Sequence, residues 1–402
     1  MKLSLFLIVV VDLVGFGIII PLLPFYGEHF QADPQTVGLL MATYSLAQFV
    51  AAPFWGRLSD RVGRRPVLLL SLAGAAAAYI WLAFADALWM LFAARALGGL
   101  MAGNIAAAFA YMADITTKEN RAKGMGLIGA AFGIGFILGP AIGGILAGSD
   151  PTTADFRNPA LAAAGLSLLA LVLGIFRLPE SLSADVRARA AALPRQRRIG
   201  QFLAALQLPG VGRLMLLGFL ATFVFAGLET TFAMWSRRTF GWGPEQNGWL
   251  FAYVGLLSAA VQGGLMGRLA KRFGERNLLI QGAFALAIGI GGLPFCTQIW
   301  QLGLAMAVAA YGFSIINPAY NSLISQQVAD TDQGGVMGVT RSVTTAARVL
   351  GPAWGGMLFA QFGRDWPYFS GALIMAAVML LALAIPPSRP AEQASQADGN
   401  AG

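Results

Sequence analysis

The chain has 402 residues, of which 57% are hydrophobic and 11% charged, whereas a soluble domain carries about 25% charged residues. This composition excludes an ordinary water-soluble fold, and the 50 glycines suit the close packing of membrane helices. The net charge of +8 comes from basic residues between apolar runs, which favours membrane orientation over nucleic-acid binding. His29 and Cys296 are the sole residues of their types, so neither a metal site nor a cofactor is expected.

Twelve apolar runs follow along the chain, each long enough to cross about 30 Å of hydrocarbon. They lie at 4–24, 37–56, 67–84, 88–112, 125–147, 160–178, 212–234, 247–266, 278–295, 299–322, 335–358 and 367–386. The sequence therefore predicts an all-α membrane protein with twelve transmembrane helices. The first run is too long for a signal-peptide core, so we expect it to be retained.

The links between these runs alternate in charge. Basic residues gather after the second, fourth and eighth runs, for example at Arg57, Lys118 and Arg268. Because cationic loops stay in the cytoplasm, both termini are expected on the cytoplasmic side of the inner (plasma) membrane. We expect four parts: a six-helix bundle at 1–178, a cytoplasmic linker at 179–210, a six-helix bundle at 211–388 and a disordered tail at 389–402.

The two halves repeat one another. Gly56 to Arg65 recurs as Gly267 to Arg276, offset by 211 residues, and Gly139 to Gly144 recurs as Gly351 to Gly356, offset by 212. Matches whose offsets agree to within one residue, at the same point of each half, predict two pseudo-symmetric bundles related by an axis along the membrane normal.

The link after the second run has a distinctive arrangement of charge. Its glycines permit a tight turn, and Asp60 can meet the positive end of a helix or an arginine. Setting the topology would need the basic residues alone, so the acid indicates a further role, and the family resemblance given below implies that this role is conformational gating. The candidate gating residues here are Gly56, Asp60, Arg61, Gly63, Arg64 and Arg65.

The fifth run carries glycine at every fourth position. Gly135, Gly139 and Gly143 form a smooth helix face on which another helix can pack, Gly144 lies beside it, and Pro140 removes a backbone donor so that the helix can bend. A packing face without any bearing on transport direction is sufficient to explain the glycines.

Three charged residues fall inside apolar runs. Asp12 lies roughly 15 Å beyond Lys2, near the midplane, and Arg95 lies roughly 10 Å from the outer end of its run. Glu229 lies among threonines and aromatic residues. Ionisable residues in the membrane are functional candidates, so we expect these three to couple transport to protons. The alternative is that each pairs with a neighbouring polar group for structure.

Further polar residues at helical spacing are candidates for a substrate cavity. Two pairs are spaced by one helical turn, Tyr44 with Gln48 and Asn317 with Asn321. For these pairs, helix–helix hydrogen bonding is the alternative to substrate contact. The candidates are Tyr44, Gln48, Asn317, Asn321 and Arg348.

Three of these segments resemble signatures of one transporter family. Gly56 to Leu69 resembles the loop between helices 2 and 3 of the major facilitator superfamily. Gly135 to Gly144 is similar to the motif of exporters in its drug:proton antiporter branch, and Leu91 to Gly99 is similar to a third signature of these antiporters. The resemblance implies the major facilitator fold, an export direction, and contact of Asp60 with the inner end of helix 11, where Arg341 lies.

The first half is particularly similar to tetracycline-efflux proteins, chiefly over Asp12 to Pro24 and Gly56 to Leu70. Those exporters place further acids in helices 3 and 9, whereas 71–84 and 278–295 contain none. Tetracycline is therefore a doubtful substrate. Glu229 would supply a second carboxylate suited to a cationic or zwitterionic amphiphile.

We therefore expect a proton-coupled antiporter that exports small amphiphilic compounds by alternating access. Its partners would be a small-molecule substrate, protons and the lipid bilayer, and it would act as a monomer. An enzyme is disfavoured because the sequence has no nucleophile–base pair or P-loop. The alternatives are a transporter of an endogenous metabolite, lipid or siderophore, and a membrane receptor or scaffold.

Overall fold

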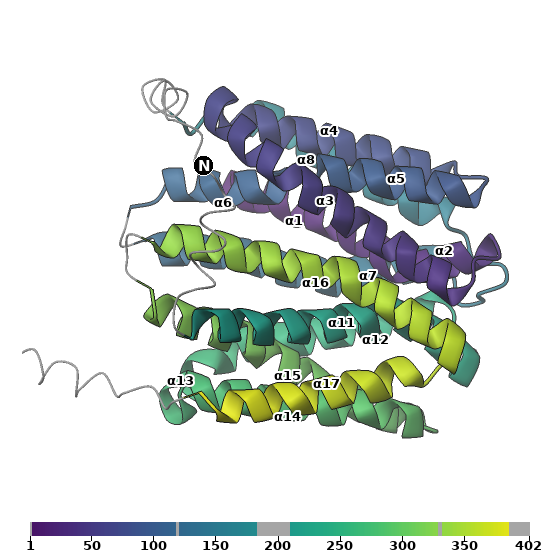
Figure 1. Ribbon diagram of the computed structural model, residues 1–402. Helices are drawn as coiled ribbons and strands as arrows, with labels where there is room; N and C mark the ends of the chain where they lie inside the picture. The colour runs from purple at the N-terminus through teal and green to yellow at the C-terminus, as the bar shows by residue number, and fades with distance from the viewer. Residues whose placement is uncertain (1, 118–119, 183–209, 329–331, 386–402) are drawn as a thin grey trace, which may run out of the picture. The chain divides into compact units, whose positions relative to one another are not determined.

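The computed structural model describes residues 2–117, 120–182, 210–328 and 332–385, so most of the expected linker and the expected tail lie outside it. Figure 1 shows that these residues are helical almost throughout, and its helix labels are the ones used in the text. They are α1 (Lys2–Ile19), η1 (Ile20–Leu22), α2 (Leu23–His29), α3 (Pro34–Val62), α4 (Arg64–Ala83), α5 (Leu88–Met101), α6 (Asn104–Asp114), α7 (Arg121–Ala147), α8 (Arg157–Arg177), α11 (Val211–Phe240), α12 (Pro244–Ala260), η2 (Val261–Leu265), α13 (Met266–Phe273), α14 (Glu275–Gly292), η3 (Leu293–Phe295), α15 (Ile299–Gln326), α16 (Gln333–Phe362) and α17 (Trp366–Leu383).

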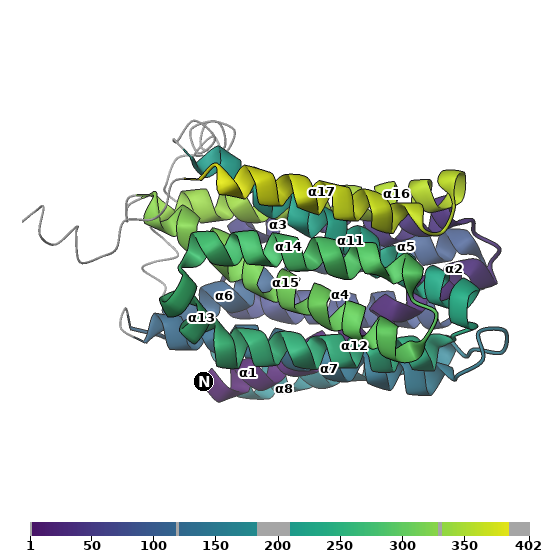
Figure 2. The same cartoon turned by 90° about the horizontal axis from the view of Figure 1, so that it is seen from below.

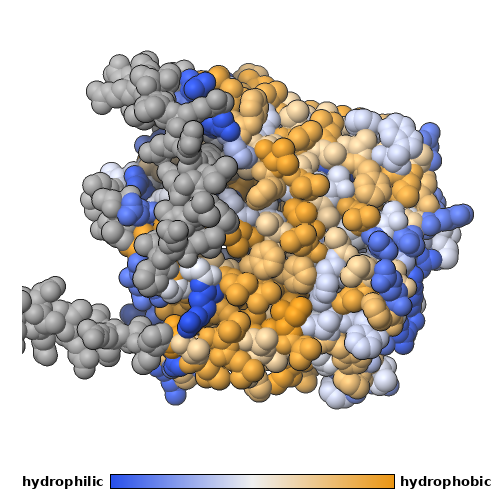
Figure 3. All heavy atoms as spheres, in the orientation of Figure 1, coloured by the Kyte–Doolittle hydropathy of each residue, from blue (hydrophilic) through white to orange (hydrophobic). Residues whose placement is uncertain are grey.

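Eleven helical segments in the described ranges are long and apolar enough to cross a membrane. Each overlaps one of the expected apolar runs. The remaining run, 335–358, lies in α16, which is 30 residues long but carries Arg341, Arg348 and several hydroxyl side chains that lower its mean hydropathy. On the face in Figure 3, hydrophobic residues lie over the middle of the helices and hydrophilic residues gather at their ends, as lipid contact requires.

Local sequence explains where several helices begin and end. The Asp33 side chain accepts a hydrogen bond of 2.8 Å from the Thr36 amide and caps α3, whose first residue is Pro34. The same helix ends at Val62 and is followed by Gly63, where φ is +119° and a side chain would be strained. Gln298 and Gln301 form a reciprocal capping box at the start of α15.

The chain divides by spatial proximity into two compact units. The first consists of 1–197, 222–259 and 344–370, and the second of 198–221, 260–343 and 371–402. In the first unit, α1 packs against α7 and α8, and α4 packs against α8 and α5; Figure 2 shows α1 beside α7 and α8. In the second unit, α14 packs along α15. The boundaries of the two six-helix bundles stay a prediction.

One expected helix is interrupted. The run 88–112 was expected to be continuous, but α5 ends at Met101 and α6 begins at Asn104. Ala102 leaves the helical conformation, with ψ of 49°. We refer to α5 and α6 together as span 4.

Candidate functional site

Asp12 is buried within α1 and is bound by two other helices. Its side chain is 6% exposed. The amide Nδ2 of Asn104, at the start of α6, donates to Oδ2 of Asp12, and the Ser167 hydroxyl of α8 donates to Oδ1 over a long 3.5 Å. Both carboxylate oxygens therefore have neutral donors, and the role of Asp12 in proton coupling stays a prediction.

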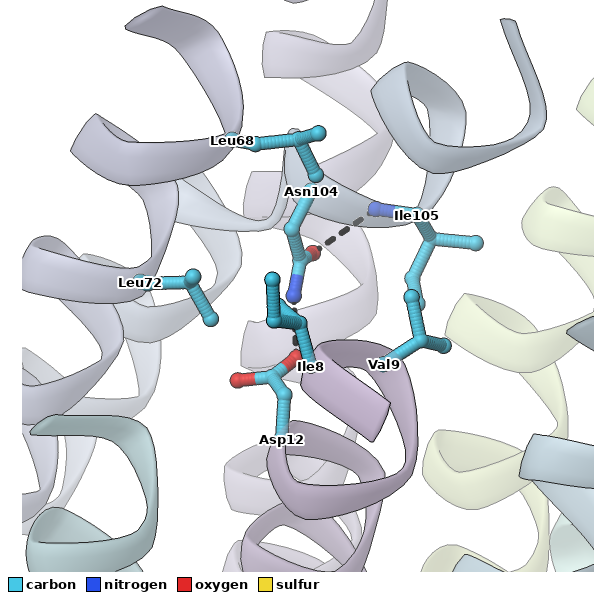
Figure 4. A pocket seen from close by; sticks show the side chains of 7 residues that line it. All are labelled: Ile8, Val9, Asp12, Leu68, Leu72, Asn104 and Ile105. Carbon is cyan, nitrogen blue, oxygen red and sulfur yellow. Dashed lines mark hydrogen bonds between the residues drawn. The ribbon is translucent and has the colours of Figure 1, made fainter. Parts of the chain in front are cut away.

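A small cavity lies beside this carboxylate (Figure 4). Its volume is about 10 Å³, close to the minimum that one water molecule needs. Asp12 and Asn104 are its polar members, and the other lining residues are apolar. The lining consists of Ile8, Val9, Asp12, Leu68, Leu72, Asn104 and Ile105.

Arg95 of α5 is also 6% exposed. Its guanidinium carbon lies 4.4 Å from the centre of the Tyr44 ring, a cation–π distance. Its Nε atom is buried and has no hydrogen-bond partner in the described part of the chain. The Phe16 ring lies 5.3 Å from that of Tyr44, so Arg95 sits in an aromatic corner formed by α1, α3 and α5.

Close packing of α3 on α5 creates this corner. A Cβ atom at Gly99 would collide with the carbonyl of Tyr44 and lie 2.8 Å from the Ala47 Cβ. Glycine is therefore required for the approach that brings Tyr44 over Arg95. Gln48, one helical turn beyond Tyr44, is partly buried.

Glu229 of α11 and Arg348 of α16, which both lie in predicted spans, form an ion pair. Arg348 Nη1 lies 3.8 Å from Glu229 Oε2, and the side chains are 44% and 12% exposed. Glycines bring these two helices together, because a Cβ at Gly355 would lie 3.2 Å from the Gly227 Cα. Sequence had selected both charged residues but not their pairing.

The glycines of α7 contact two different helices. A Cβ at Gly135 would lie 2.8 Å from Leu13 of α1, and one at Gly139 would lie 2.6 Å from Gly17. Gly143 packs on α1 in the same way, beside Ile18. The expected smooth face is therefore a packing face for α1.

Gly144 and Pro140 extend this contact to α12. A Cβ at Gly144 would lie 2.7 Å from the carbonyl of Pro244, and one at Gly248 would collide with the carbonyl of Pro140. The second copy repeats the arrangement, because Gly356 of α16 packs against Gly38 of α3. The repeat seen in sequence thus recurs as matched helix crossings.

The expected gating loop forms a charged network at the end of α3. Arg64 Nη1 donates to Asp60 Oδ1 at 2.5 Å, and Arg64 Nε donates to Asp114 Oδ2 at 3.2 Å. The Asp60 side chain is 52% exposed. Gly63 supplies the turn, and Arg61 and Gly56 flank the network. Contact of Asp60 with Arg341, which belongs to the second unit, stays a prediction.

Glu180 is a member of this network that sequence reasoning missed. Its Oε1 accepts from the Arg64 amide at 2.9 Å and its Oε2 from the Arg65 amide at 3.2 Å. A carboxylate there neutralises the positive end of α4. The acid could not be singled out from sequence because it lies 116 residues from Arg64, in the expected linker.

The last arginine of each repeated loop donates to backbone carbonyls at the end of a helix in its own unit. Arg65 Nη2 donates to the Ile175 carbonyl near the end of α8 at 2.8 Å. Arg276 Nε and Nη2 donate to the carbonyls of Ile385 and Leu383, at the end of α17, over 2.5 and 2.7 Å. Each arginine therefore satisfies carbonyls that a helix end leaves free.

The two candidate asparagines of α15 bond within their own helix. Asn321 Nδ2 donates to the Asn317 carbonyl at 2.8 Å, and both residues are partly buried. Among the residues that the structure describes, no cluster of three His, Cys, Asp or Glu side chains could hold a metal ion.

The sequence profile of the Major Facilitator Superfamily matches residues 5–265 and 214–401. The chain belongs to the major facilitator superfamily. It is a multi-pass membrane transporter of small molecules and not an enzyme, and the expected fold and family resemblance are confirmed.

Curated members of the major facilitator superfamily that resemble this chain include resistance proteins. The tetracycline resistance protein, class C, of Escherichia coli is 35% identical over 361 residues, 89% of each chain. Multidrug resistance protein 2 of Bacillus subtilis is 29% identical over 370 residues, which are 91% of this chain and 90% of the relative.

Among solved structures, the human organic anion transporter MFSD10 has 26% identity and a TM-score of 0.72, with 95% of this chain and 98% of that chain covered. A D-xylose–proton symporter, at 19% identity and a TM-score of 0.74 over 96% of this chain and 98% of that chain, shares the major facilitator fold.

Proposed function

We propose that the protein is a drug:proton antiporter that exports small amphiphilic compounds by alternating access. One observation carries the proposal. Asp12 is deep in the first span and buried, its two oxygens are held by neutral donors, and none of the ion pairs found between described residues includes it. A buried carboxylate without a bound cation can take either a proton or a cationic group.

Glu229 would be the second exchanging carboxylate. Its partner Arg348 is half exposed and lies 3.8 Å away, a loose contact from which a cationic substrate could displace it. Arg95, Tyr44 and Gln48 would line the cavity on one side, with Asn317 and Asn321 as further candidates. The similarity to tetracycline and multidrug resistance proteins supports antibiotic or multidrug efflux.

The electrical driving force is adequate for the export of a neutral or zwitterionic compound, because exchange of one proton for a monovalent cation moves no net charge and depends on the pH gradient alone. One proton moving across about 100 mV supplies roughly 2.3 kcal/mol. This corresponds to a concentration ratio of roughly fifty, at about 1.4 kcal/mol for each factor of ten.

We further propose a monomer in the inner membrane with both termini in the cytoplasm. The basic links support this orientation. It would place the crossings of Gly38 with Gly356 and of Gly144 with Gly248 toward the outside. Their close packing supports a state closed on that side, and the two bundles would rock about a midplane cavity to open it.

The test uses inverted vesicles that contain the full-length protein, with an imposed pH gradient, and screens cationic dyes and antibiotics. We expect at least one compound to dissipate the gradient, and Asp12→Asn to abolish this. Asp150→Asn, which changes an exposed loop acid, should leave it intact. The proposal fails if no compound acts and Asp12→Asn leaves all measured transport unchanged.

A second candidate is the transport of an endogenous organic anion. The observation that favours it is the buried guanidinium of Arg95, whose Nε lacks a hydrogen-bond partner in the described ranges. The similarity to a human organic anion transporter supports the same substrate class. Anionic dyes belong in the screen, and their uptake with sensitivity to Arg95→Leu would favour this alternative.

A further inference from the structure

Span 4 is interrupted, and a hydrogen bond from another helix stabilises the interruption. In a continuous helix the Leu100 carbonyl would accept from the Asn104 amide. Ala102, between these two residues, leaves the helical conformation. The indole Nε1 of Trp55, on α3, donates to the Leu100 carbonyl at 2.5 Å. Trp55 thus supplies the donor whose absence would make the break costly.

Gly103 leaves room for the indole at this point. A Cβ atom there would lie 2.5 Å from Cγ of Trp55 and 3.0 Å from the Ser71 hydroxyl. The indole is 4% exposed, so it has little freedom to move aside. A larger residue at 103 would push Trp55 away from Leu100.

Asn104 is the first residue of α6 after the break, and both the oxygen and the nitrogen of its side-chain amide make hydrogen bonds. Its Oδ1 accepts from the Ile105 amide at 2.9 Å, so its Nδ2 is the atom that faces Asp12 (Figure 4). An amide nitrogen can donate and cannot accept. The contact therefore fits an ionised Asp12 better than a protonated one.

The surroundings of Asp12 leave Asn104 as its principal polar partner. The helices packed against α1 carry charged side chains near their ends, at Arg121, Lys123, Arg157, Arg177 and Asp114. Tyr44 of α3 and Tyr79 of α4 interact with Asp12 electrostatically. The Ser167 contact is long at 3.5 Å, and the remaining neighbours in the cavity are apolar.

We propose that Asn104 is a positioning residue that couples the protonation of Asp12 to the shape of span 4. The proposal rests on the proposed function, in which Asp12 carries the proton. An ionised Asp12 holds Asn104 and keeps span 4 broken. Protonation weakens the contact between Asp12 and the Asn104 side chain. The backbone N–H of Asn104 can then donate to the Leu100 carbonyl, as in a continuous helix. The half of span 4 that carries Arg95 then changes its direction relative to Asp12.

The test follows the carboxyl stretching band of Asp12 by infrared spectroscopy in the reconstituted full-length protein as the pH is varied. Asp12→Asn identifies the band by removing it. Asn104→Ala removes the donor to the carboxylate, so the midpoint should move to higher pH by about one unit, tenfold in proton affinity. Trp55→Phe removes the donor to Leu100 and should shift the midpoint in the same direction.

The matched control is Asn247→Ala. Asn247 is a fully buried amide that contacts Ser236 and the Gly243 carbonyl, so its loss should lower protein yield without moving the midpoint. An unchanged midpoint in Asn104→Ala or in Trp55→Phe overturns the inference. Failure of the proposed function is distinguishable, because transport would then survive Asp12→Asn whatever the midpoints are.

Discussion

Glu28, in the last turn of α2, accepts a hydrogen bond of 2.8 Å from Arg237, near the end of α11. Arg238 lies 3.5 Å from the other oxygen of the same carboxylate, and its guanidinium lies 4.6 Å from the Phe359 ring. The Glu28 side chain is 11% exposed. This ion pair joins the ends of the first and seventh predicted spans.

Glu28→Gln should loosen this end of the first unit. A partly exposed ion pair contributes about 1 kcal/mol, so the population open at this end should rise about fivefold. Spin labels on the loops 30–33 and 241–243 would report it as a larger fraction of long distances. Glu245→Gln changes an acid of α12 that is outside the described ion pairs and should leave the distances as they are. Equal distributions in the two variants would contradict the prediction.

The crossing of α7 with α12 should tolerate no side chain at Gly144. A Cβ there would lie 2.7 Å from the Pro244 carbonyl and 2.9 Å from the Glu245 Cα. Gly144→Val should therefore abolish transport, because the two helices could no longer close on each other. Gly126→Val is the control on the same helix, since a Cβ at Gly126 has nothing within 4 Å. Equal transport by the two variants in vesicles would rule out a functional crossing.

The aromatic partner of Arg95 can be tested with graded changes. Tyr44→Phe keeps the ring beneath the guanidinium and should retain most transport, whereas Tyr44→Leu removes a cation–π contact of about 1 to 2 kcal/mol. Vesicle transport should then fall roughly tenfold, at about 1.4 kcal/mol per factor of ten. If Tyr44→Phe is as impaired as Tyr44→Leu, the hydroxyl rather than the ring is the functional group.

The cap of α3 should make stability depend on pH. Hydrogen bonds from Thr36 hold the pKa of Asp33 below its ordinary value. A lowered pKa in the folded state adds stability above the unfolded pKa, and that stability is lost as the pH falls through the folded pKa. Asp33→Ala should cost about 0.5 to 1 kcal/mol at neutral pH.

Thermal unfolding in detergent would measure this cost at neutral and at acidic pH. The difference between wild type and Asp33→Ala should shrink on acidification. Asp33→Asn caps the helix without titrating, so its advantage over Asp33→Ala should persist at low pH. A wild-type advantage that grows as the pH falls would contradict the assigned sign.

The sequence was sufficient for the spans because hydrocarbon imposes a length and an apolar composition on each of them. It also identified Asp12, Arg95 and Glu229, since a charge inside an apolar run is conspicuous. It could not identify their partners. Asn104 and Ser167 are 92 and 155 residues from Asp12, and such pairings depend on how whole helices pack.

The break in span 4 was missed for a related reason. Gly103 looks like any other small residue of a membrane helix, and neither a proline nor a charge marks the position. The indole of Trp55 that contacts the break lies 45 residues from Leu100, and a local pattern does not contain that information.

Arg65 and Arg276 make equivalent contacts in the two halves, and this equivalence bears on how the chain arose. If one ancestral half was duplicated, its two descendants were free to diverge wherever no contact constrained them. The first half has Asp60 where the second half has Lys271. In both halves, however, the equivalent arginine donates to carbonyls at the end of the sixth helix. The arginine contact therefore stabilises the end of the sixth helix within each half, whereas the acid at position 60 is not shared by the two halves.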